Sequence, residues 1–205
     1  MIHVASDPEG TPVNLYLRLL LMTLRTRAGR GDRPLSIWDT AATAFRVAPT
    51  DLDLLGHMNN GRYLTIMDLA RLDLMTRSGF WARLRRRGWY PVVAGQTISY
   101  RRSLTLGQRF TVHTRVLGLD ERWIYLEQTF AVGADLYAQA AVRARFLRRG
   151  GGSVSHDEVL ELTGPLPAGR EVPGWLLEWS AGSKPARTWG QPGRIGEDPS
   201  GQGLE

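Results

Sequence analysis

Ten consecutive residues hold the densest group of side chains in this sequence that could do chemistry. In order, they are Asp51, Leu52, Asp53, Leu54, Leu55, Gly56, His57, Met58, Asn59 and Asn60. They stand directly before a run with helical periodicity. A helix N-terminus presents unpaired backbone N–H groups and a partial positive charge, so it can stabilise an oxyanion formed on a carbonyl group. A carboxylate across from it can activate water or attack directly. The alternative is that the Asp and Asn residues only form turns and caps.

Other kinds of active site are disfavoured by what the sequence lacks. There is no cysteine, which excludes a disulfide scaffold, a cysteine-ligated zinc site and a cysteine nucleophile. No Gly-x-Ser-x-Gly elbow of a serine hydrolase occurs, because the segment Gly151-Gly152-Ser153-Val154-Ser155 lacks the closing glycine. No phosphate loop, dinucleotide fingerprint or metal-ligand spacing is present. We therefore expect neither a metal nor a cofactor.

The chain has a formal net charge of +6, carried almost wholly by arginine. This charge indicates either an arginine-rich composition or an anionic partner, such as coenzyme A or a membrane surface. Nucleic acid is not expected, because no helix-turn-helix, zinc-finger or RNA-binding signature is visible. Arginine binds phosphate in a bidentate manner, so one basic group could hold the phosphates of coenzyme A, or could simply be solvated. Its members are Arg83, Arg85, Arg86, Arg87, Arg101 and Arg102.

A long helix is predicted over residues 61–78, directly after the reactive segment. Most of its positions are apolar, and Thr65, Asp68 and Arg71 form a polar strip at helical spacing. A helix that is apolar over most of its circumference must be buried on several sides. Gly79 is a suitable terminator.

Strands are predicted on both sides of this helix. One short strand at 44–47 precedes it, and four follow, at 92–100, 109–117, 123–132 and 136–147, with turns at 118–121 and 133–135. We interpret the four as a meander. The fold class is therefore α+β, with an antiparallel sheet wrapped around one long central helix.

The chain divides into an N-terminal extension at 1–40, a domain at 41–150 and a Gly/Pro-rich tail at 151–205. The tail is expected to be largely irregular from residue 164, except where residues 175–179 dock on the domain. Residues 13–27 are expected to form a helix, either an arm packed on the domain or an amphipathic helix lying on a membrane.

The N-terminus predicts a protein without a spanning segment or a signal peptide. The apolar stretch 13–24 has about 12 residues and contains Arg18, whereas a bilayer requires roughly 20. Asp7 and Glu9 stand where a signal peptide would be basic. We expect a cytoplasmic location, with peripheral membrane association as the alternative.

At this point a family resemblance can be stated. The pattern Asp51-x-Asp53-x-x-Gly56-His57-Met58-Asn59-Asn60-x-x-Tyr63 resembles the signature of hotdog-fold thioesterases of the 4-hydroxybenzoyl-CoA thioesterase type, in a branch with a His-Met-Asn-Asn segment. Asp68-x-Ala70-Arg71, Ile98-x-Tyr100-Arg101-Arg102 and Leu106-Gly107-Gln108 continue the resemblance in order over about residues 43–149. It implies a hotdog fold and hydrolysis of an acyl-CoA or acyl-carrier thioester. It also implies a homodimer or homotetramer with the acyl site near the subunit interface.

The resemblance also implies roles for single residues. Asp53 would be the general base or nucleophile, and the backbone N–H near Asn60 would bind the thioester oxygen. His57 would either form a catalytic pair with Asp53 or, as the place of His57 in the loop favours, make a structural hydrogen bond. The Asn60 side chain, where some relatives carry histidine, would orient water or substrate. Six residues are candidates for binding substrate: Gly56, Asn59, Tyr63, Asp68, Arg101 and Arg102. Tyr63 would either face the acyl pocket or support the helix start, and Asp51 would hold the loop.

The sequence departs from the family pattern in two places. Asp68 stands where many relatives carry Glu, and Arg102-Ser103-Leu104 stands where a proline often precedes the turn. A hydratase of the same fold is disfavoured, because such enzymes carry His five positions after the Asp, where this chain has Gly56 and Met58. The remaining alternative to a thioesterase is a non-catalytic acyl-CoA-binding or membrane-associated scaffold protein of the same fold.

Overall fold

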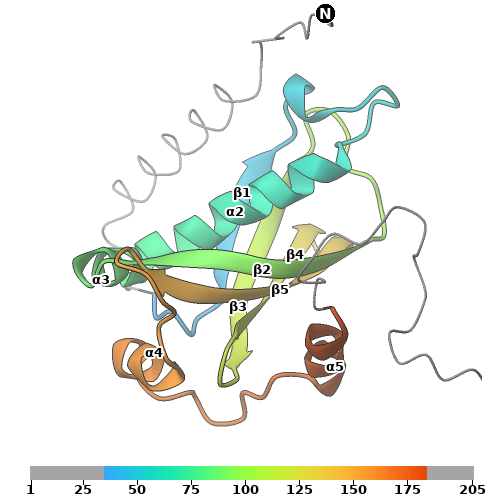
Figure 1. Ribbon diagram of the computed structural model, residues 1–205. Coiled ribbons are helices and arrows are strands. Elements are labelled where there is room, and N and C mark those ends of the chain that lie inside the picture. Colours follow the sequence, from blue (N-terminus) through green and yellow to red (C-terminus); the bar gives the residue numbers. More distant parts are fainter. Residues whose placement is uncertain (1–34, 184–205) are drawn as a thin grey trace, which may run out of the picture.

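The computed structural model describes residues 35–183, and the segments predicted at 13–27 and beyond 183 lie outside that range. Figure 1 shows a curved sheet with one long helix lying across it. In chain order the elements are β1 Ala41–Arg46, η1 Pro49–Asp51, α2 Asn60–Arg77, α3 Phe80–Arg86, β2 Trp89–Tyr100, β3 Arg109–Leu119, β4 Ile124–Val132, β5 Asp135–Arg148, α4 His156–Thr163 and α5 Gly174–Gly182. The predicted helix and all five predicted strands are present. The expected arrangement of an antiparallel sheet around one central helix is confirmed.

The strand order is β1-β3-β4-β5-β2, and every pairing is antiparallel. The predicted four-strand meander is therefore wrong at its first strand. β2 pairs with β5 over nearly its whole length, from Trp89 opposite Arg148 to Tyr100 opposite Ala138, and not with β3. Because α2 carries the chain across the sheet between β1 and β2, these two strands lie at opposite edges.

The core beneath α2 divides into two clusters along the helix axis. The first gathers Tyr63, Ile66 and Met67 of α2 against Phe110 of β3 and Phe130 of β4. The second gathers the end of α2 and α3 with β3, β5 and α4, and includes Leu74, Phe80, Val116, Phe146 and Val159. The helix is therefore in contact with apolar side chains along its whole length, as its composition predicts.

Arg71, the last residue of the predicted polar strip on the helix, is buried. Its guanidinium donates to the Gln128 side-chain oxygen and pairs with Asp68. Gln128 in turn donates to the Met67 carbonyl oxygen and to the Thr114 hydroxyl, both at 3.0 Å. Burial lowers the pKa of Arg71 below its usual value, and Asp68 partly opposes that shift. These partners satisfy a cation that would be costly to bury alone.

Two helices follow the sheet in the region predicted as a tail. α4 was not predicted, although its capping box is visible in the sequence as Ser155 followed by Glu158. α4 is tied to α3, since Arg83 donates to the Leu162 carbonyl at 2.9 Å and Arg87 pairs with Glu161 at 3.3 Å.

α5 forms at the tryptophan-rich segment that was expected to dock, and Figure 1 shows it apart from α4. Leu176 is fully buried against Tyr125 and Ala141 on the sheet face away from α2. Arg143, itself buried, lies over the rings of Trp123 and Trp179, with its Cζ 4.9 and 5.3 Å from their centroids. Residues 164–173 are irregular, but the described tail as a whole is less irregular than predicted.

Candidate active site

The carboxylate of Asp53 is held in a fixed position by its own loop. Its Oδ1 accepts hydrogen bonds from the backbone N–H of Leu55 at 2.9 Å and of His57 at 3.2 Å. The backbone N–H of Asp53 donates to the His57 carbonyl at 2.8 Å. Within residues 35–183, no hydrogen bond engages Oδ2. One oxygen therefore orients the carboxylate, and the other is open to a water or a substrate.

Gly56 makes the turn of this loop. Its φ is 76°, in the left-handed region that glycine adopts without strain, and its N–H donates to the Asp53 carbonyl at 3.1 Å. A side chain at this position would strain the turn that aims the Asp53 carboxylate. The contact with substrate predicted for Gly56 stays a prediction.

The start of α2 lies beside this loop. Asn59 is the N-cap, and its side-chain oxygen accepts from the Gly61 N–H at 2.8 Å. Asn60 is the first helical residue and is exposed, and its carbonyl accepts from the Tyr100 hydroxyl at 3.4 Å. Among the described residues, none accepts a hydrogen bond from the N–H of Asn60. The helix start thus offers the free donor that oxyanion binding requires, while Asn59 already acts as a cap.

Asp51 and His57 support the loop rather than forming a pair with Asp53. Asp51 is 1% exposed, and its Oδ2 accepts from the Ala48 N–H at 2.8 Å. The backbone of His57 bonds to Asp53 and bridges to Thr105, while its imidazole is exposed and makes no hydrogen bond to the described part of the chain. Any residue at this position could make these backbone hydrogen bonds, so the role of the His57 side chain stays a prediction.

Tyr63 lies in the first core cluster, one turn into α2. It is 2% exposed, and its ring centroid is 5.0 Å from those of both Tyr100 and Phe130. Burial raises the pKa of its hydroxyl. Of the two predicted roles, this position favours support of the helix start.

The six arginines predicted as a possible phosphate site do not lie together. Arg101 and Arg102 follow β2 in a loop that adjoins the Asp53 loop, where the Met58 N–H donates to the Leu104 carbonyl at 2.8 Å. Both are exposed, and Arg102 pairs with Asp135 at 2.9 Å. Arg83, Arg85, Arg86 and Arg87 stand at the other end of α2, where two of them hold α4. Only Arg101 and Arg102 remain near the predicted chemistry.

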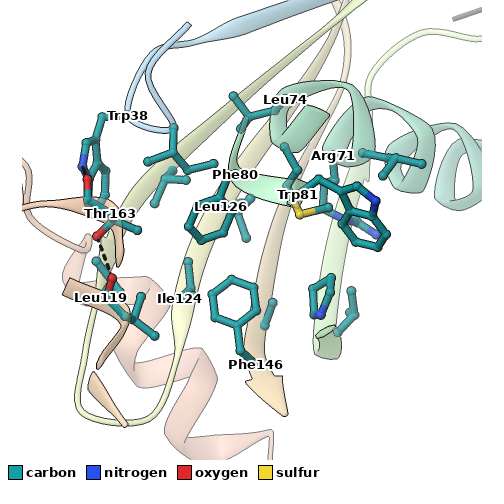
Figure 2. Close-up of a pocket in the computed structure, with 18 of the residues that line it drawn as sticks. Trp38, Arg71, Leu74, Phe80, Trp81, Leu119, Ile124, Leu126, Phe146 and Thr163 are labelled. Atoms are coloured by element: carbon teal, nitrogen blue, oxygen red, sulfur yellow. Dashed lines mark hydrogen bonds between the residues drawn. The ribbon is translucent and has the colours of Figure 1, made fainter. Parts of the chain in front are cut away.

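A cavity of about 250 Å³ opens beneath the C-terminal half of α2. Figure 2 shows Arg71 and Trp81 at one end, Trp38, Leu119 and Thr163 at the other, and apolar side chains between them. The space is partly open to solvent, so it is an accessible pocket and not an enclosed packing void. The sequence did not predict this cavity, because its lining residues have the apolar character of an ordinary hydrophobic core.

Asp68 is the carboxylate at this cavity. It lines the opening together with Arg71, its side chain is 68% exposed, and the two form an ion pair. Asp53 does not line the cavity. Asn60 and Arg71 are eleven residues apart on α2, which corresponds to roughly 16 Å. In one chain, the predicted base and the cavity therefore lie at different ends of the helix.

Two further tests concern metals and membranes. Within residues 35–183, no group of three or more His, Asp or Glu side chains is placed to hold a metal ion. In the same range, no helix combines the length and apolar character needed to cross a bilayer.

Comparison with known proteins identifies the family. The model of the thioesterase-like superfamily matches residues 47–180. This chain belongs to that superfamily. The match extends through the loop, α2, the strands that follow and most of α5, so it includes both helices beyond residue 150.

Among curated proteins, the chain is similar to Protein THEM6 of Xenopus laevis, with 44% identity over 99 residues, 48% of each chain. It is 42% identical over 100 residues to Protein THEM6 of Danio rerio, covering 49% of this chain and 50% of that one. The thioesterase lcsJ of Purpureocillium lilacinum is 24% identical over 152 residues, 62% of this chain and 49% of the relative. The chain thus spans about half the length of each of these three relatives.

Solved structures confirm the hotdog fold. The probable thioesterase YbaW of Escherichia coli superposes with a TM-score of 0.56 at 23% identity, covering 59% of this chain and 94% of that one. A gentisyl-coenzyme A thioesterase, BH1999, gives 0.54 at 18% identity, covering 59% and 99%. A 4-hydroxybenzoyl-CoA thioesterase complexed with 4-hydroxybenzoyl-CoA gives 0.54 at 14% identity, covering 61% and 99%. At these identities the likeness concerns the fold.

Proposed function

We propose that this protein hydrolyses acyl-CoA thioesters to a carboxylic acid and a free thiol, with Asp53 as the general base or nucleophile. The observation that carries the proposal is the pairing of an oriented carboxylate with a free helix N-terminus. Asp53 is fixed through Oδ1 with Oδ2 open, and the N–H of Asn60 has no acceptor in the described chain. Membership of the thioesterase-like superfamily supports the same reaction class.

As a general base, Asp53 would take a proton from water as the water oxygen adds to the thioester carbonyl carbon. The negative charge then on the carbonyl oxygen would be held by the N–H of Asn60 and the positive end of α2. Collapse of the tetrahedral intermediate would break the C–S bond, and the proton on Asp53 would pass to the leaving thiolate. As a nucleophile, Asp53 would attack the carbonyl carbon and form an anhydride as the C–S bond breaks and the thiolate leaves. Water then hydrolyses the anhydride to the free acid and regenerates the Asp53 carboxylate.

Arg101 and Arg102 are proposed to receive the coenzyme A phosphates. Both are exposed and adjoin the Asp53 loop. Charge reversal at Arg101 should raise KM for an acyl-CoA and leave KM for a short thioester without the nucleotide unchanged. An equal rise for both substrates would remove this role.

We further propose that the working site is shared by two copies of the chain. β2 lies at the edge of the sheet and has no partner on its outer side among the described strands. An open strand edge favours pairing with a second copy. If two β2 strands pair in antiparallel fashion about a two-fold axis, their α2 helices run in opposite directions on one face. The Asp53 loop of one copy then approaches the cavity half of the other.

Mixing two inactive variants tests the shared site. Asp53→Asn removes the base, and Ala144→Phe fills the cavity. Random association of the two should restore about a quarter of wild-type activity, because half of the dimers are mixed and each holds one intact site. Recovery of no activity, with both variants folded and dimeric, would place the whole site within one chain.

The assignment of the base is tested by comparing three single variants on one acyl-CoA. Asp53→Asn should lower kcat at least ~100-fold, the scale of a lost general base. Asp68→Asn and His57→Ala should each cost less, since Asp68 is paired with Arg71 and the backbone hydrogen bond from His57 to Asp53 survives the change to Ala. A larger loss for Asp68→Asn would indicate that Asp68, at the mouth of the cavity, is the catalytic carboxylate. A larger loss for His57→Ala would indicate that His57 is a catalytic residue.

A non-catalytic acyl-CoA-binding or membrane-associated scaffold is the alternative. Detectable acyl-CoA binding without thiol release from any substrate would favour it. The proposed cytoplasmic or peripheral membrane location would be tested separately, by flotation of the chain with liposomes.

A further inference from the structure

The cavity under α2 differs from ordinary packing defects in size and shape. At about 250 Å³ it exceeds an engineered apolar cavity of about 150 Å³ that binds benzene. Figure 2 shows it running from Arg71 and Trp81 to Trp38 and Thr163, with Phe80 and Leu126 along its length. The space is therefore elongated, apolar along its walls, and polar at the end where Asp68 is exposed.

The far end is closed by segments outside the sheet and its central helix. Trp38 precedes β1, and Val159 and Thr163 belong to α4. The Trp38 indole N–H donates to the Thr163 carbonyl at 3.2 Å, which joins these segments into one wall. Arg170 adds a further tie, because its guanidinium donates to the carbonyl oxygens of Trp38 and Val116.

The donors of this wall are already used within the protein. The indole N–H is bonded to Thr163, and the Thr163 hydroxyl lies 3.0 Å from the Val159 carbonyl and 2.9 Å from the Gly164 carbonyl. Among these two side chains, a hydroxyl group carried into this end would find no free donor and one acceptor, the Thr163 hydroxyl oxygen. Burying a polar group with its hydrogen-bonding capacity only partly met is unfavourable. The end wall therefore suits a plain hydrocarbon terminus.

We infer that the cavity binds the unsubstituted straight acyl chain of the thioester, with space for roughly eight carbons. That the bound chain is part of a thioester rests on the proposed function. That the cavity binds a hydrocarbon chain does not depend on the proposed function. A water-sized group takes roughly 30 Å³, so about 250 Å³ holds roughly eight groups of that size. The chain enters beside Asp68 and Arg71, and the wall formed by Trp38 and α4 limits its length.

Direct binding of free straight-chain fatty acids from four to sixteen carbons tests the chain site without any turnover. Calorimetric titration of the whole protein should show affinity rising about fourfold per methylene and levelling off near eight carbons. Ala144→Leu, which fills part of the cavity, should move the limit two to three carbons shorter. Val159→Ala, which deepens the closed end, should move it one to two carbons longer. Ala82→Leu adds the same bulk as Ala144→Leu on the exposed face of α3 and should leave the limit unchanged.

Two outcomes would overturn the inference. One is affinity that keeps rising to sixteen carbons in wild type and both cavity variants alike, which would indicate surface binding. The other is a hydroxylated aromatic acid binding as tightly as the eight-carbon chain, where we expect at least tenfold weaker binding. A chain-length limit without thiol release from acyl-CoA would leave the inference standing and contradict the proposed hydrolysis. Thiol release from acyl-CoA without a chain-length limit would contradict the inference and leave the proposed hydrolysis standing.

Discussion

The two halves of the core beneath α2 are built from similar residues but packed differently. In the half near Asp53, the rings of Tyr63, Phe110 and Phe130 contact one another at centroid distances of 5.0 and 5.9 Å. In the half near α4, Phe80 and Phe146 also contact each other at 5.6 Å, yet they border a cavity. The packed half fixes the helix start that carries the proposed chemistry, and the hollow half leaves space for an apolar group. Tight packing and open space thus lie beneath opposite ends of one helix.

The largest effect should come from removing a ring in the packed half. Phe130→Ala should lower the free energy of unfolding by about 3–5 kcal/mol, because the fully buried ring leaves a void between Tyr63 and Phe110. Leu126→Ala, on the same strand but lining the cavity, should cost about 2 kcal/mol, since its side chain already borders empty space. Urea unfolding of both variants gives the two values. Equal losses would mean that the two halves are packed alike.

Adding bulk on strand β5 should also cost more stability in the packed half than in the hollow half. Ala140→Leu enters the packed half and should destabilise the fold by about 1–3 kcal/mol through overpacking. Ala144→Leu enters the hollow half and should change stability by less than about 1 kcal/mol. The same denaturant titration measures both. A cost for Ala144→Leu as large as that for Ala140→Leu would argue against an accessible cavity.

The smallest effect concerns the end wall and appears in acid. Glu158 caps α4, and hydrogen bonds from Ser155, followed by those from Arg148, lower its pKa from 4.5 to about 2. A depressed carboxyl pKa stabilises the folded state above pH 4.5, and this contribution is lost as the pH falls toward 2. The protection of the α4 amides against hydrogen exchange, relative to the intrinsic rate at each pH, should therefore fall over that interval. Glu158→Gln should show faster exchange at neutral pH and no such step. A step of equal size in the variant would assign the change to another group.

The sequence predicted those features that depend on local pattern. The apolar run at 61–78 and the alternating strands gave the central helix and the sheet, because burial imposes those periods directly. The segment 51–60 predicted a loop with a carboxylate before a helix, and the hydrogen bonds of Asp53 to Leu55 and His57 agree with it. The place of β2 beside β5 was missed, since strand pairing is decided by the path of the chain and not by a strand's own residues.

Two other features depend on three-dimensional packing. Arg71 reads as a surface residue on a helical projection, and only the position of Gln128 on β4 explains its burial. The cavity lies between side chains of several helices and strands that do not contact one another. The sequence of any one of these segments therefore cannot predict it. α4 is a different case, because the capping pattern of Ser155 and Glu158 is visible in the sequence and is sufficient to predict the start of a helix.

The most direct test of the proposed hydrolysis is thiol release from octanoyl-CoA by wild type and by Asp53→Asn, measured side by side. Wild type should turn over the substrate, and the variant should lose at least ~100-fold in rate while it stays equally stable and still binds octanoate. Absence of turnover in wild type, or turnover that Asp53→Asn leaves unchanged, would contradict the proposed function.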